Sequence, residues 1–365
     1  MANRILDVKA IDVKAIIQRA AEAAGFDLCG IAPATDAPEL EYFPAWIAAG
    51  HAGEMKYLEA RNDQGALKRE SLSHVAPWTR SVIVCAINYN TAHPYSSEVH
   101  NPTRGWISRY AWSREDYHDA VLRRLKQVEA ALRQGIPKEG QTNLITRSYV
   151  DTGPVVERVY AKYAGVGWIG KNTCIINQQK GSWLFLGVIL TSLELAPDLP
   201  APDRCGTCTR CLDACPTNAF VGPYKLDSTK CISYLTIEKR GSIPEDLREG
   251  IGHNVFGCDI CQDVCPWNRK APVTSAPEFQ PRPQLVNPAL QWLAEMGAEE
   301  FPEVFRRSPI KRTKLAGLRR NTAIAMGNSG EQAFRPVLEK MAHQDKDESV
   351  AESARWALAR LNDPS

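Results

Sequence analysis

The sequence predicts an α/β (α+β) domain that is followed by a cysteine-rich module and an α-helical tail. Helix and strand patterns alternate up to residue 195, eight of the eleven cysteines lie between residues 205 and 265, and a short helical motif recurs at a 34-residue offset near the end. With 365 residues and 44% hydrophobic content, the chain can bury the cores of about two or three domains.

The first domain (1–195) is expected to alternate helices and strands. Each helix has apolar residues at helical spacing, and the last begins after Pro154, a residue that suits the first turn. A glycine-rich loop, GVGWIGKN (165–172), precedes a continuously apolar strand of the buried kind. The strands are expected at 27–34, 81–89, 144–151 and 183–190, and the helices at 12–24, 115–133 and 155–163.

A proline-rich connector, APDLPAPD, opens the second domain (196–284), and the composition turns helical in the third (285–365). In the third, AIAMGN (323–328) matches ALARLN (357–362), and this period suits paired-helix repeats. Only about two such units fit, which is fewer than a free-standing solenoid needs. We therefore expect the tail to pack on the rest of the protein.

Cysteine spacing is the strongest chemical signal in the sequence. The first run reads C-x2-C-x2-C-x3-C-P, by which ferredoxins give three thiolates to one [4Fe–4S] cluster and the fourth to its neighbour. The second run repeats the ending C-x2-C-x3-C-P. A pair of zinc knuckles is the alternative, although zinc sites rarely space four thiolates in this way. The runs consist of Cys205, Cys208, Cys211 and Cys215, and of Cys231, Cys258, Cys261 and Cys265.

The ferredoxin pattern also predicts that the two runs exchange one ligand. Cys265 would then complete the first cluster and Cys215 the second. The remaining cysteines, Cys29, Cys85 and Cys174, lie in apolar segments and are expected to be buried core thiols. Because a cluster transfers single electrons, the rest of the chain is expected to hold something for it to reduce.

Asp151 is the candidate general acid. It ends a predicted strand, and a buried carboxyl can keep its proton near neutral pH and donate it to a leaving oxygen. The alternative is that Asp151 caps the turn into the next helix.

A large planar ligand is suggested by the glycine-rich loop, which has neither a dinucleotide nor a P-loop motif but lets the backbone approach closely. The segment SRYAWSREDYH (108–118) could line the same ligand. A cobalamin lower-ligand motif, Asp-x-His-x-x-Gly, is nearly present from Asp116 to Val121 but fails at the glycine. A corrinoid bound here is therefore expected to be base-off, without histidine.

A basic segment lies at the start of the tail, where residues 304–330 contain no Asp or Glu. The net charge of the whole chain is only +2, so affinity for nucleic acid has to come from such a local patch. The alternative is a solvated helix face. The basic residues are Arg306, Arg307, Lys311, Arg312, Lys314, Arg319 and Arg320.

No stretch approaches the roughly 18 uncharged apolar residues that would cross a membrane. Residues 1–24 lack the apolar core and cleavage site of a secretory signal. A cytoplasmic location is expected.

Together the motifs resemble the epoxyqueuosine reductase family over nearly the whole chain. The matching segments are RYAWSREDYH, SYVDTGPVVERVYAKYAGVGWIGKNT, CGTCTRCLDACPTNAF, CISYLTIE, GCDICQDVCPWN and SPIKRTKLAGLRRNTAIAMGN. The resemblance implies a cobalamin-binding core, a bacterial ferredoxin-like module with two [4Fe–4S] clusters, and a HEAT-like tail. It also implies reduction of epoxyqueuosine to queuosine at the wobble position of tRNAs with a GUN anticodon.

The resemblance assigns roles to individual residues. Asp151 matches the family's proton donor to the epoxide oxygen. Contacts to cobalamin are implied for Arg109, Tyr110, Asp151, Gly170, Lys171, Asn172 and Gln262, and contacts to the anticodon stem-loop for Arg312, Lys314, Arg319, Arg320 and Asn321. Trp106 or Trp267 could stack on bases, although core packing is expected of both.

Three other functions remain open from the sequence. A corrinoid reductase of a small molecule would need no basic tail, and a ferredoxin-like carrier would need no large first domain. A tRNA-binding protein without catalysis would leave the eight cluster cysteines unexplained. The electron donor is not identified by the sequence, and a monomer is expected because the single basic groove suits one stem-loop.

Overall fold

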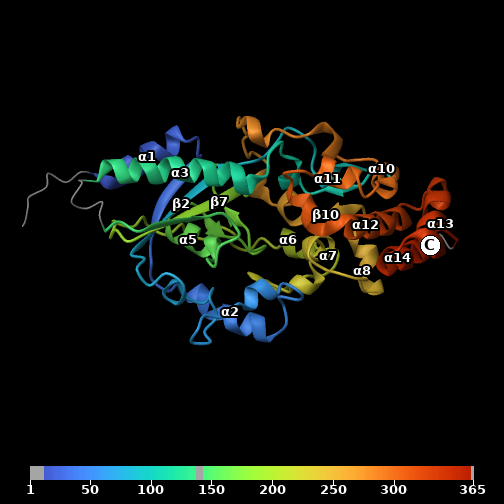
Figure 1. The fold of residues 1–365 in the computed structure, drawn as a ribbon, viewed down its shortest axis with the longest axis horizontal. Helices are drawn as coiled ribbons and strands as arrows, with labels where there is room; N and C mark the ends of the chain where they lie inside the picture. Colours follow the sequence, from blue (N-terminus) through green and yellow to red (C-terminus); the bar gives the residue numbers. More distant parts are fainter. Residues whose placement is uncertain (1–11, 137–142, 363–365) are drawn as a thin grey trace, which may run out of the picture.

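Residues 12–136 and 143–362 are described by the computed structural model (Figure 1). A sheet with its helices lies at one end, helices α13 and α14 lie at the other, and the cysteine-rich module lies between them. No helix in these described ranges is long and apolar enough to cross a membrane. Residues 1–11, which the expectation about a secretory signal includes, lie outside them.

A four-stranded sheet in the order β1-β2-β7-β4 forms the centre of the first domain. All three pairings are antiparallel, so the fold is α+β and does not have the parallel sheet of an alternating α/β fold. Continuously apolar strands are typical of parallel sheets, but here helices cover both faces of an antiparallel one. The strands, close to the predicted ones, are β1 Leu28–Pro33, β2 Ser81–Asn88, β4 Thr146–Tyr149 and β7 Leu184–Thr191.

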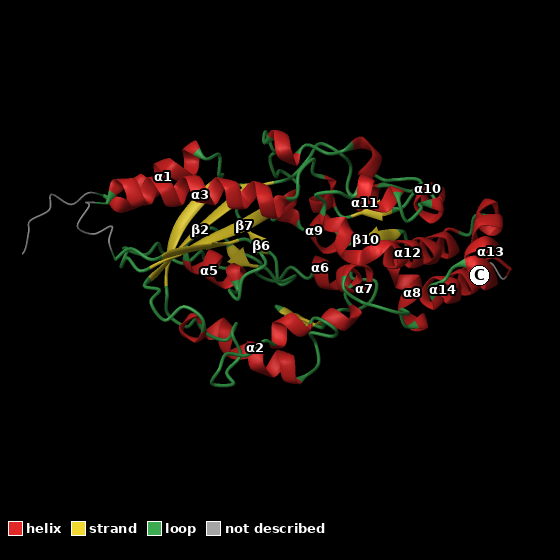
Figure 2. Cartoon of the chain, viewed as in Figure 1, coloured by secondary structure: helices red, strands yellow, loops and turns green. Residues whose placement is uncertain are grey.

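Helices α1 (Val13–Ala23) and α3 (Tyr117–Gly135) pack together on one face of the sheet, and α5 (Glu157–Tyr163) packs on the other (Figure 2). Helix α5 begins two residues later than predicted, so Pro154 precedes the helix and is not in its first turn. Helix α2 (Pro38–Ala48) was not predicted and lies beyond α5 in Figure 1.

The glycine-rich segment contains β5 (Trp168–Ile169), which forms a small antiparallel hairpin with β6 (Ile175–Ile176). The cysteine-rich module follows, and its two short cysteine-bearing helices, α6 and α9, pack against each other. Strand β10 pairs in parallel with β3 (Trp106–Ile107), which fastens the module to the first domain. Its elements are α6 Arg210–Asp213, β8 Phe220–Gly222, β9 Lys225–Leu226, α7 Ile232–Ile237, α8 Glu245–Ile251, β10 Asn254–Phe256 and α9 Ile260–Asp263.

The tail packs on the rest of the protein, as predicted. The two matching segments lie in α12 and α14, and these helices contact each other so closely that a Cβ on Gly327 would lie 2.9 Å from the Cβ of Ala357. The same hydrophobic core includes Trp106, Trp112 and Phe256 from outside the tail. The helices are α10 Leu290–Glu295, α11 Glu300–Val304, α12 Lys314–Ser329, α13 Arg335–Gln344 and α14 Glu348–Asn362.

Candidate active site and cluster cavity

Asp151 lies just beyond the end of β4, in a loop that leads to α5. Its φ is +58°, a left-handed backbone conformation that is unfavourable for most side chains and is common at functional sites. The backbone N–H of Asp151 donates to Oε1 of Glu157 at 2.8 Å, which holds this conformation. The Asp151 side chain is 68% exposed, yet protein crowds around it on most sides. It therefore projects into an open hollow.

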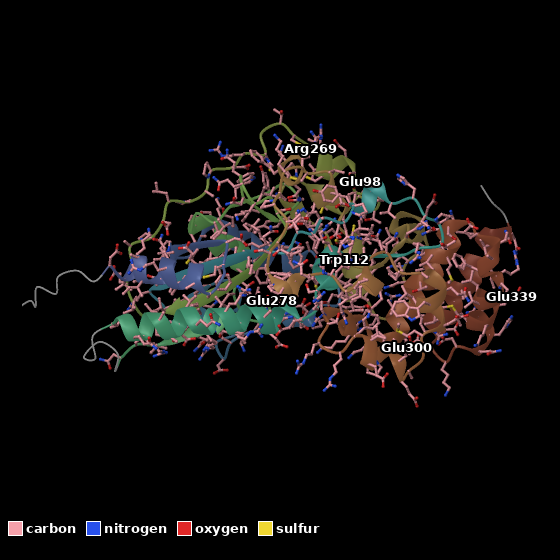
Figure 3. All side chains as sticks on the ribbon, turned by 90° about the horizontal axis from the view of Figure 1, so that it is seen from above. Glu98, Trp112, Arg269, Glu278, Glu300 and Glu339 are labelled. Carbon is pink, nitrogen blue, oxygen red and sulfur yellow. The ribbon has the colours of Figure 1, made fainter. Side chains whose placement is uncertain are left out.

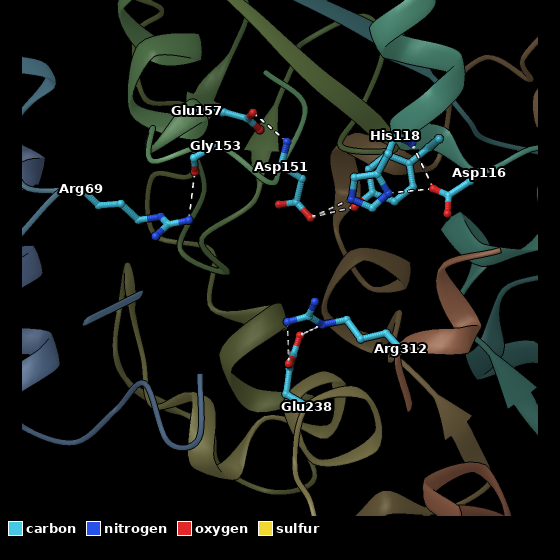
Figure 4. Close-up of polar contacts among 9 residues, drawn as sticks. Arg69, Asp116, His118, Asp151, Gly153, Glu157, Glu238 and Arg312 are labelled. Atoms are coloured by element: carbon cyan, nitrogen blue, oxygen red, sulfur yellow. Dashed lines mark hydrogen bonds and ion pairs between the residues drawn. The ribbon is translucent and has the colours of Figure 1, made fainter. Parts of the chain in front are cut away.

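The start of α3 supplies the partners of the Asp151 carboxylate (Figure 4). The hydroxyl of Tyr117 donates to Oδ2 at 2.8 Å, and Nε2 of His118 lies 3.6 Å from the same oxygen. Asp116 caps α3 by accepting from the His118 backbone N–H, and its Oδ1 also lies 2.7 Å from Nδ1 of His118. The imidazole is thus held between two carboxylates.

These contacts decide where the protons are. Burial opposes ionisation of Asp151, but hydrogen bonds from His118 and Tyr117 outweigh it and lower the pKa of Asp151 to about 2. Burial opposes protonation of His118, but its bonds to Asp116 and Asp151 raise the His118 pKa to about 9. Burial and the charge of Asp151 raise the pKa of Glu157 to about 8. The prediction that desolvation keeps a proton on Asp151 is wrong here, because near neutral pH the protons are on His118 and Glu157.

Two arginines face the same hollow from other segments (Figure 4). Nη2 of Arg69 donates to the carbonyl of Gly153 at 2.9 Å and so ties down the Asp151 loop. Arg312 makes a two-pronged ion pair with Glu238, with Nη2 2.9 Å from Oε2. Sequence reasoning missed Arg69, which lies in none of the segments that carry the resemblance, and it gave no role to Glu157, although SYVDTGPVVER contains that residue. His118 was weighed only as a cobalt ligand, although its spacing from Asp116 could have indicated the pair.

A cavity of about 300 Å³ lies between the first cysteine run and the hairpin of the glycine-rich loop. All four thiols predicted for the first cluster line it, including Cys265 from the second run. The four are Cys205, Cys208, Cys211 and Cys265. Burial, and then the charges of Cys205 and Cys211, raise the pKa of Cys265 to about 11, because the thiols of this set lie close together. The site therefore fits a cluster.

The cysteines predicted for the second cluster also lie together, and Cys215 from the first run is among them, as the predicted exchange of one ligand requires. Burial, and then the neighbouring thiols of Cys231 and Cys215, raise the pKa of Cys258, and Cys261 lies beside Cys258 and Cys231. Nowhere in the described ranges do three Cys, His, Asp or Glu side chains meet closely enough to hold a single metal ion. A cubane does not require this, since each of its thiolates binds a different iron.

A chain of contacts leads from the second set toward Asp151. Gly257, which precedes Cys258, contacts Ser108 and Tyr110: an added Cβ would lie 3.7 Å from the Tyr110 ring. Tyr110 in turn meets Tyr117 edge to face, with ring centroids 5.9 Å apart. A short aromatic path therefore joins the second cysteine set to the Asp151 hollow.

Four of the seven residues predicted to contact cobalamin fall into two groups. Tyr110 and Asp151 lie at the hollow. The other group contacts the cluster module: Nζ of Lys171 donates to the carbonyls of Gly206 and Cys208, and Asn172 donates to that of Cys261.

Two more of these residues, Gly170 and Gln262, have packing roles. A Cβ on Gly170 would lie 2.4 Å from Ile176, and Gln262 accepts from Ser182. Arg109 is 1% exposed, and its terminal nitrogens donate to backbone carbonyls of residues 91, 93 and 94. The prediction that its side chain contacts a cofactor is therefore corrected to a structural role.

Only some residues of the basic segment are exposed at the surface. Arg320 and Asn321 are 1% and 0% exposed, and they donate to carbonyls of the module and β10, so the prediction that they contact RNA is wrong. Arg319 is paired with Asp345 at 2.6 Å. The exposed cations of the segment are Arg306, Arg307, Lys311, Arg312 and Lys314. Lys311 and Arg312 act electrostatically on Asp116 and Asp151 respectively, so this surface adjoins the hollow.

Core packing is confirmed for Trp106 and Cys85, whereas Trp267, Cys29 and Cys174 are only partly buried. Trp106 is 4% exposed and donates to Asp259, which is a core role. Trp267 lines the cluster cavity and packs edge to face on Trp168. Cys85 is buried opposite Cys29 on the neighbouring strand. Cys174, expected in the core, instead lies beside the cluster cysteine Cys261.

Two family models match the chain: "Epoxyqueuosine reductase QueG, DUF1730" over residues 69–152, and "4Fe-4S double cluster binding domain" over residues 204–268. The epoxyqueuosine reductase of Xanthomonas campestris pv. campestris is 38% identical over 96% of each chain. That of Synechocystis sp. is 43% identical over 80% of this chain and 98% of its own.

A solved structure of an epoxyqueuosine reductase with an epoxyqueuosine-modified tRNA-Tyr stem loop superimposes with a TM-score of 0.84 and 30% identity. The match covers 96% of this chain and 91% of that one. The similarity therefore includes the sheet, the cysteine module and the tail.

Proposed function

The chain belongs to the epoxyqueuosine reductase family, and we propose that it reduces epoxyqueuosine to queuosine at the wobble position of tRNAs with a GUN anticodon. This is the last step of queuosine biosynthesis. The observation that carries the proposal is the Asp151 carboxylate, which Tyr117 and His118 contact in an open hollow. The rings of Tyr117 and Tyr110 link this hollow to the second cysteine set. Such a site combines a proton source with a path for electrons.

The reaction removes the epoxide oxygen as water and leaves a ring double bond, which consumes two electrons and two protons. We assign one proton to His118, whose Nε2 faces Oδ2 of Asp151. Asp151 receives this proton and donates it to the epoxide oxygen. Tyr117 holds the carboxylate in place through its hydroxyl. Asp116 orients the imidazole and keeps it charged.

The eight cysteines would hold two [4Fe–4S] clusters, and the cluster bound by the set that includes Cys258 would supply electrons on the side of the hollow. Base-off cobalamin is the further cofactor of the proposal, and it would supply a strongly reducing metal centre for the epoxide carbon. His118 is engaged at both ring nitrogens, which agrees with a corrinoid that takes no histidine ligand from the chain. Tyr110 and Tyr117 are the aromatic side chains best placed to contact its planar ring.

The substrate partner is the anticodon stem-loop, and the exposed cations of residues 306–314 face its phosphates in this proposal. The wobble nucleotide has to leave the loop to enter the hollow, as base-modifying enzymes generally require. We further propose domains at 1–195, 196–284 and 285–365, the last HEAT-like, and a monomer that takes electrons from a separate donor.

The test is anaerobic turnover of cluster-loaded protein with cobalamin, a strong reductant and epoxyqueuosine-containing tRNA, with released nucleosides identified by mass spectrometry. Cobalamin-dependent formation of queuosine is expected. Asp151→Asn should keep both clusters and bound cobalamin but lose turnover. Unchanged turnover would remove Asp151 from the mechanism. Bound cofactors without any conversion by the wild type would favour a corrinoid reductase of a small molecule.

A further inference from the structure

Tyr57 is an exposed aromatic residue at the hollow to which the proposed reaction gives no role. It lies in a 3-10 helix, Lys56–Glu59, and at 45% exposure it is more exposed than Tyr224 and Tyr42, the other exposed tyrosines of the described residues. Burial, and then the charges of Glu238 and Asp151, raise the Tyr57 pKa, so the ring is neutral and lies within electrostatic reach of the Asp151 carboxylate.

Two guanidinium groups flank this ring. The Cζ atom of Arg69 lies 5.6 Å from the ring centroid of Tyr57, and that of Arg312 lies 5.2 Å from it. Both distances are within the range of cation–π attraction. Each guanidinium is fixed by other bonds as well: Arg69 donates to the carbonyls of Tyr57 and Gly153, and Arg312 pairs with Glu238.

Three planar side chains from distant segments therefore form one partly exposed platform, which consists of Tyr57, Arg69 and Arg312. The two guanidinium groups keep their places without a bound ligand, because each bonds elsewhere in the protein, and they in turn flank the Tyr57 ring. Arg69 also binds the Asp151 loop, so the platform has a fixed position relative to the reacting carboxylate. A rigid platform loses little conformational entropy when a ligand stacks on it.

We propose that the Tyr57 platform stacks the planar deazaguanine base of the wobble nucleotide while the epoxide reaches Asp151. Single-stranded RNA bases are commonly recognised by stacking on aromatic rings and on arginine planes. A nucleotide that leaves the loop loses the stacking of its neighbours, and the platform replaces it beside the reacting group. This inference rests on the proposed function, and it makes Tyr57 a positioning residue.

The experiment uses holoprotein and an anticodon stem-loop with 2-aminopurine, a fluorescent base quenched by stacking, at the wobble position. Wild type and Tyr57→Phe, which keeps the ring, should bind the stem-loop and quench the probe. Tyr57→Leu should leave the bound probe bright and raise the Kd about tenfold, as loss of one stacked base predicts. The dependence of Kd on salt should not change, since no charge is removed.

Tyr42→Leu is the matched control. Tyr42 is 36% exposed and also has a cation over its ring, with Nζ of Lys225 at 5.2 Å, but it lies in α2 and takes no part in the platform. Its replacement should change neither the fluorescence nor the Kd.

Equal quenching and equal Kd for Tyr57→Leu and the wild type would overturn the platform proposal. If Tyr57→Leu left the stem-loop Kd unchanged but altered the absorbance of bound cobalamin, the proposal would also be overturned, because the Tyr57 ring would then contact the corrin and not the base. If the wild type itself binds no stem-loop, the proposed function fails first, and the two failures are thereby distinguished.

Discussion

At the level of single residues, the charge states around Asp151 explain why an aspartate can serve as a proton donor although its pKa is lowered. A carboxylate with a pKa of about 2 carries no proton near neutral pH. His118, with a pKa of about 9, does carry one and lies 3.6 Å away. In the proposed reaction, Asp151 therefore acts through His118, and it accepts the one proton assigned to His118 shortly before passing it on. The buried position of Asp116 at the start of α3 makes this arrangement rigid.

The pH dependence of turnover follows from the His118 pKa. Since this pKa is raised from the ordinary 6.5 to about 9, the proton is present at neutral pH and is lost as pH rises through about 9. Turnover should accordingly stay level near neutral pH and fall in the alkaline range. His118→Gln should lower turnover by at least about tenfold and remove the part of the alkaline fall that is centred near pH 9, whereas the part that begins near pH 8 belongs to Glu157 and should remain. Single-turnover rates of pre-reduced protein at several pH values measure both the loss of rate and the alkaline fall. The product is read as nucleosides released from the tRNA.

Asp116→Asn provides the control for that experiment. It keeps a side chain that can bond to the imidazole but removes one negative charge, so the alkaline fall should move to lower pH. An alkaline fall that is identical in all three proteins would assign the titration to another group.

At the level of elements, the connection between β4 and α5 positions Asp151. The loop is held at one point by Glu157, the first residue of α5, and at another by Arg69 from outside the sheet. Both bonds go to the backbone, so they fix the left-handed conformation at Asp151 without occupying its carboxylate.

Glu157 should act as a neutral hydrogen-bond acceptor at physiological pH, because burial and Asp151 raise its pKa to about 8. Glu157→Gln keeps an acceptor and should retain wild-type turnover at neutral pH. Glu157→Ala removes the bond to the Asp151 N–H and should lower kcat several-fold, within the roughly 1–3 kcal/mol of an unmade buried hydrogen bond. Above about pH 8, the Gln variant should exceed the wild type, whose Glu157 then ionises beside Asp151. Parallel pH profiles of kcat decide this, and equal profiles for Ala and wild type would contradict it.

The elements that sequence reasoning found are those with a clear period. Alternation and helical spacing located the four sheet strands, α1 and α3 to within a few residues, because burial on one or both faces sets those patterns. Sheet direction was not recoverable, since a strand buried on both faces looks the same in either direction. Residues 35–80, which include α2 and Arg69, were not interpreted.

The basic segment shows the limit of counting charges. Helix α12 is buried along most of its length, so Arg320 points inward and donates to the carbonyls of Leu235, Lys239 and Gly241. A sequence cannot separate this arginine from Arg312, because the difference depends on how α12 packs against α7. The cluster ligands were easier to predict from the sequence than the exposed cations, because short spacings between cysteines set the local ligand geometry.

At the level of the whole molecule, the cysteine module holds the sheet domain and the tail together. Strand β10 pairs with β3 from the first domain, and Asn321 of α12 bonds to the carbonyl of Val255 in the same strand. The module face near Asp151 and the exposed cations before α12 consequently lie on neighbouring parts of the surface. Arg269, at the edge of the molecule in Figure 3, marks a different part of the module, beside the first cysteine run.

Salt dependence should separate the exposed cations from the structural ones. Each phosphate contact contributes about 0.7 to 0.9 to the slope of log Kd against log salt, because binding releases condensed counterions. Lys311→Ala and Lys314→Ala should each weaken stem-loop binding and lower that slope by about this amount. Lys340→Ala, an exposed cation on α13, should leave it unchanged. Titrations at several salt concentrations measure the slopes. Equal slopes in all variants would move the phosphate contacts away from residues 306–314 and leave Tyr57 and Arg69 as the surface that positions the RNA.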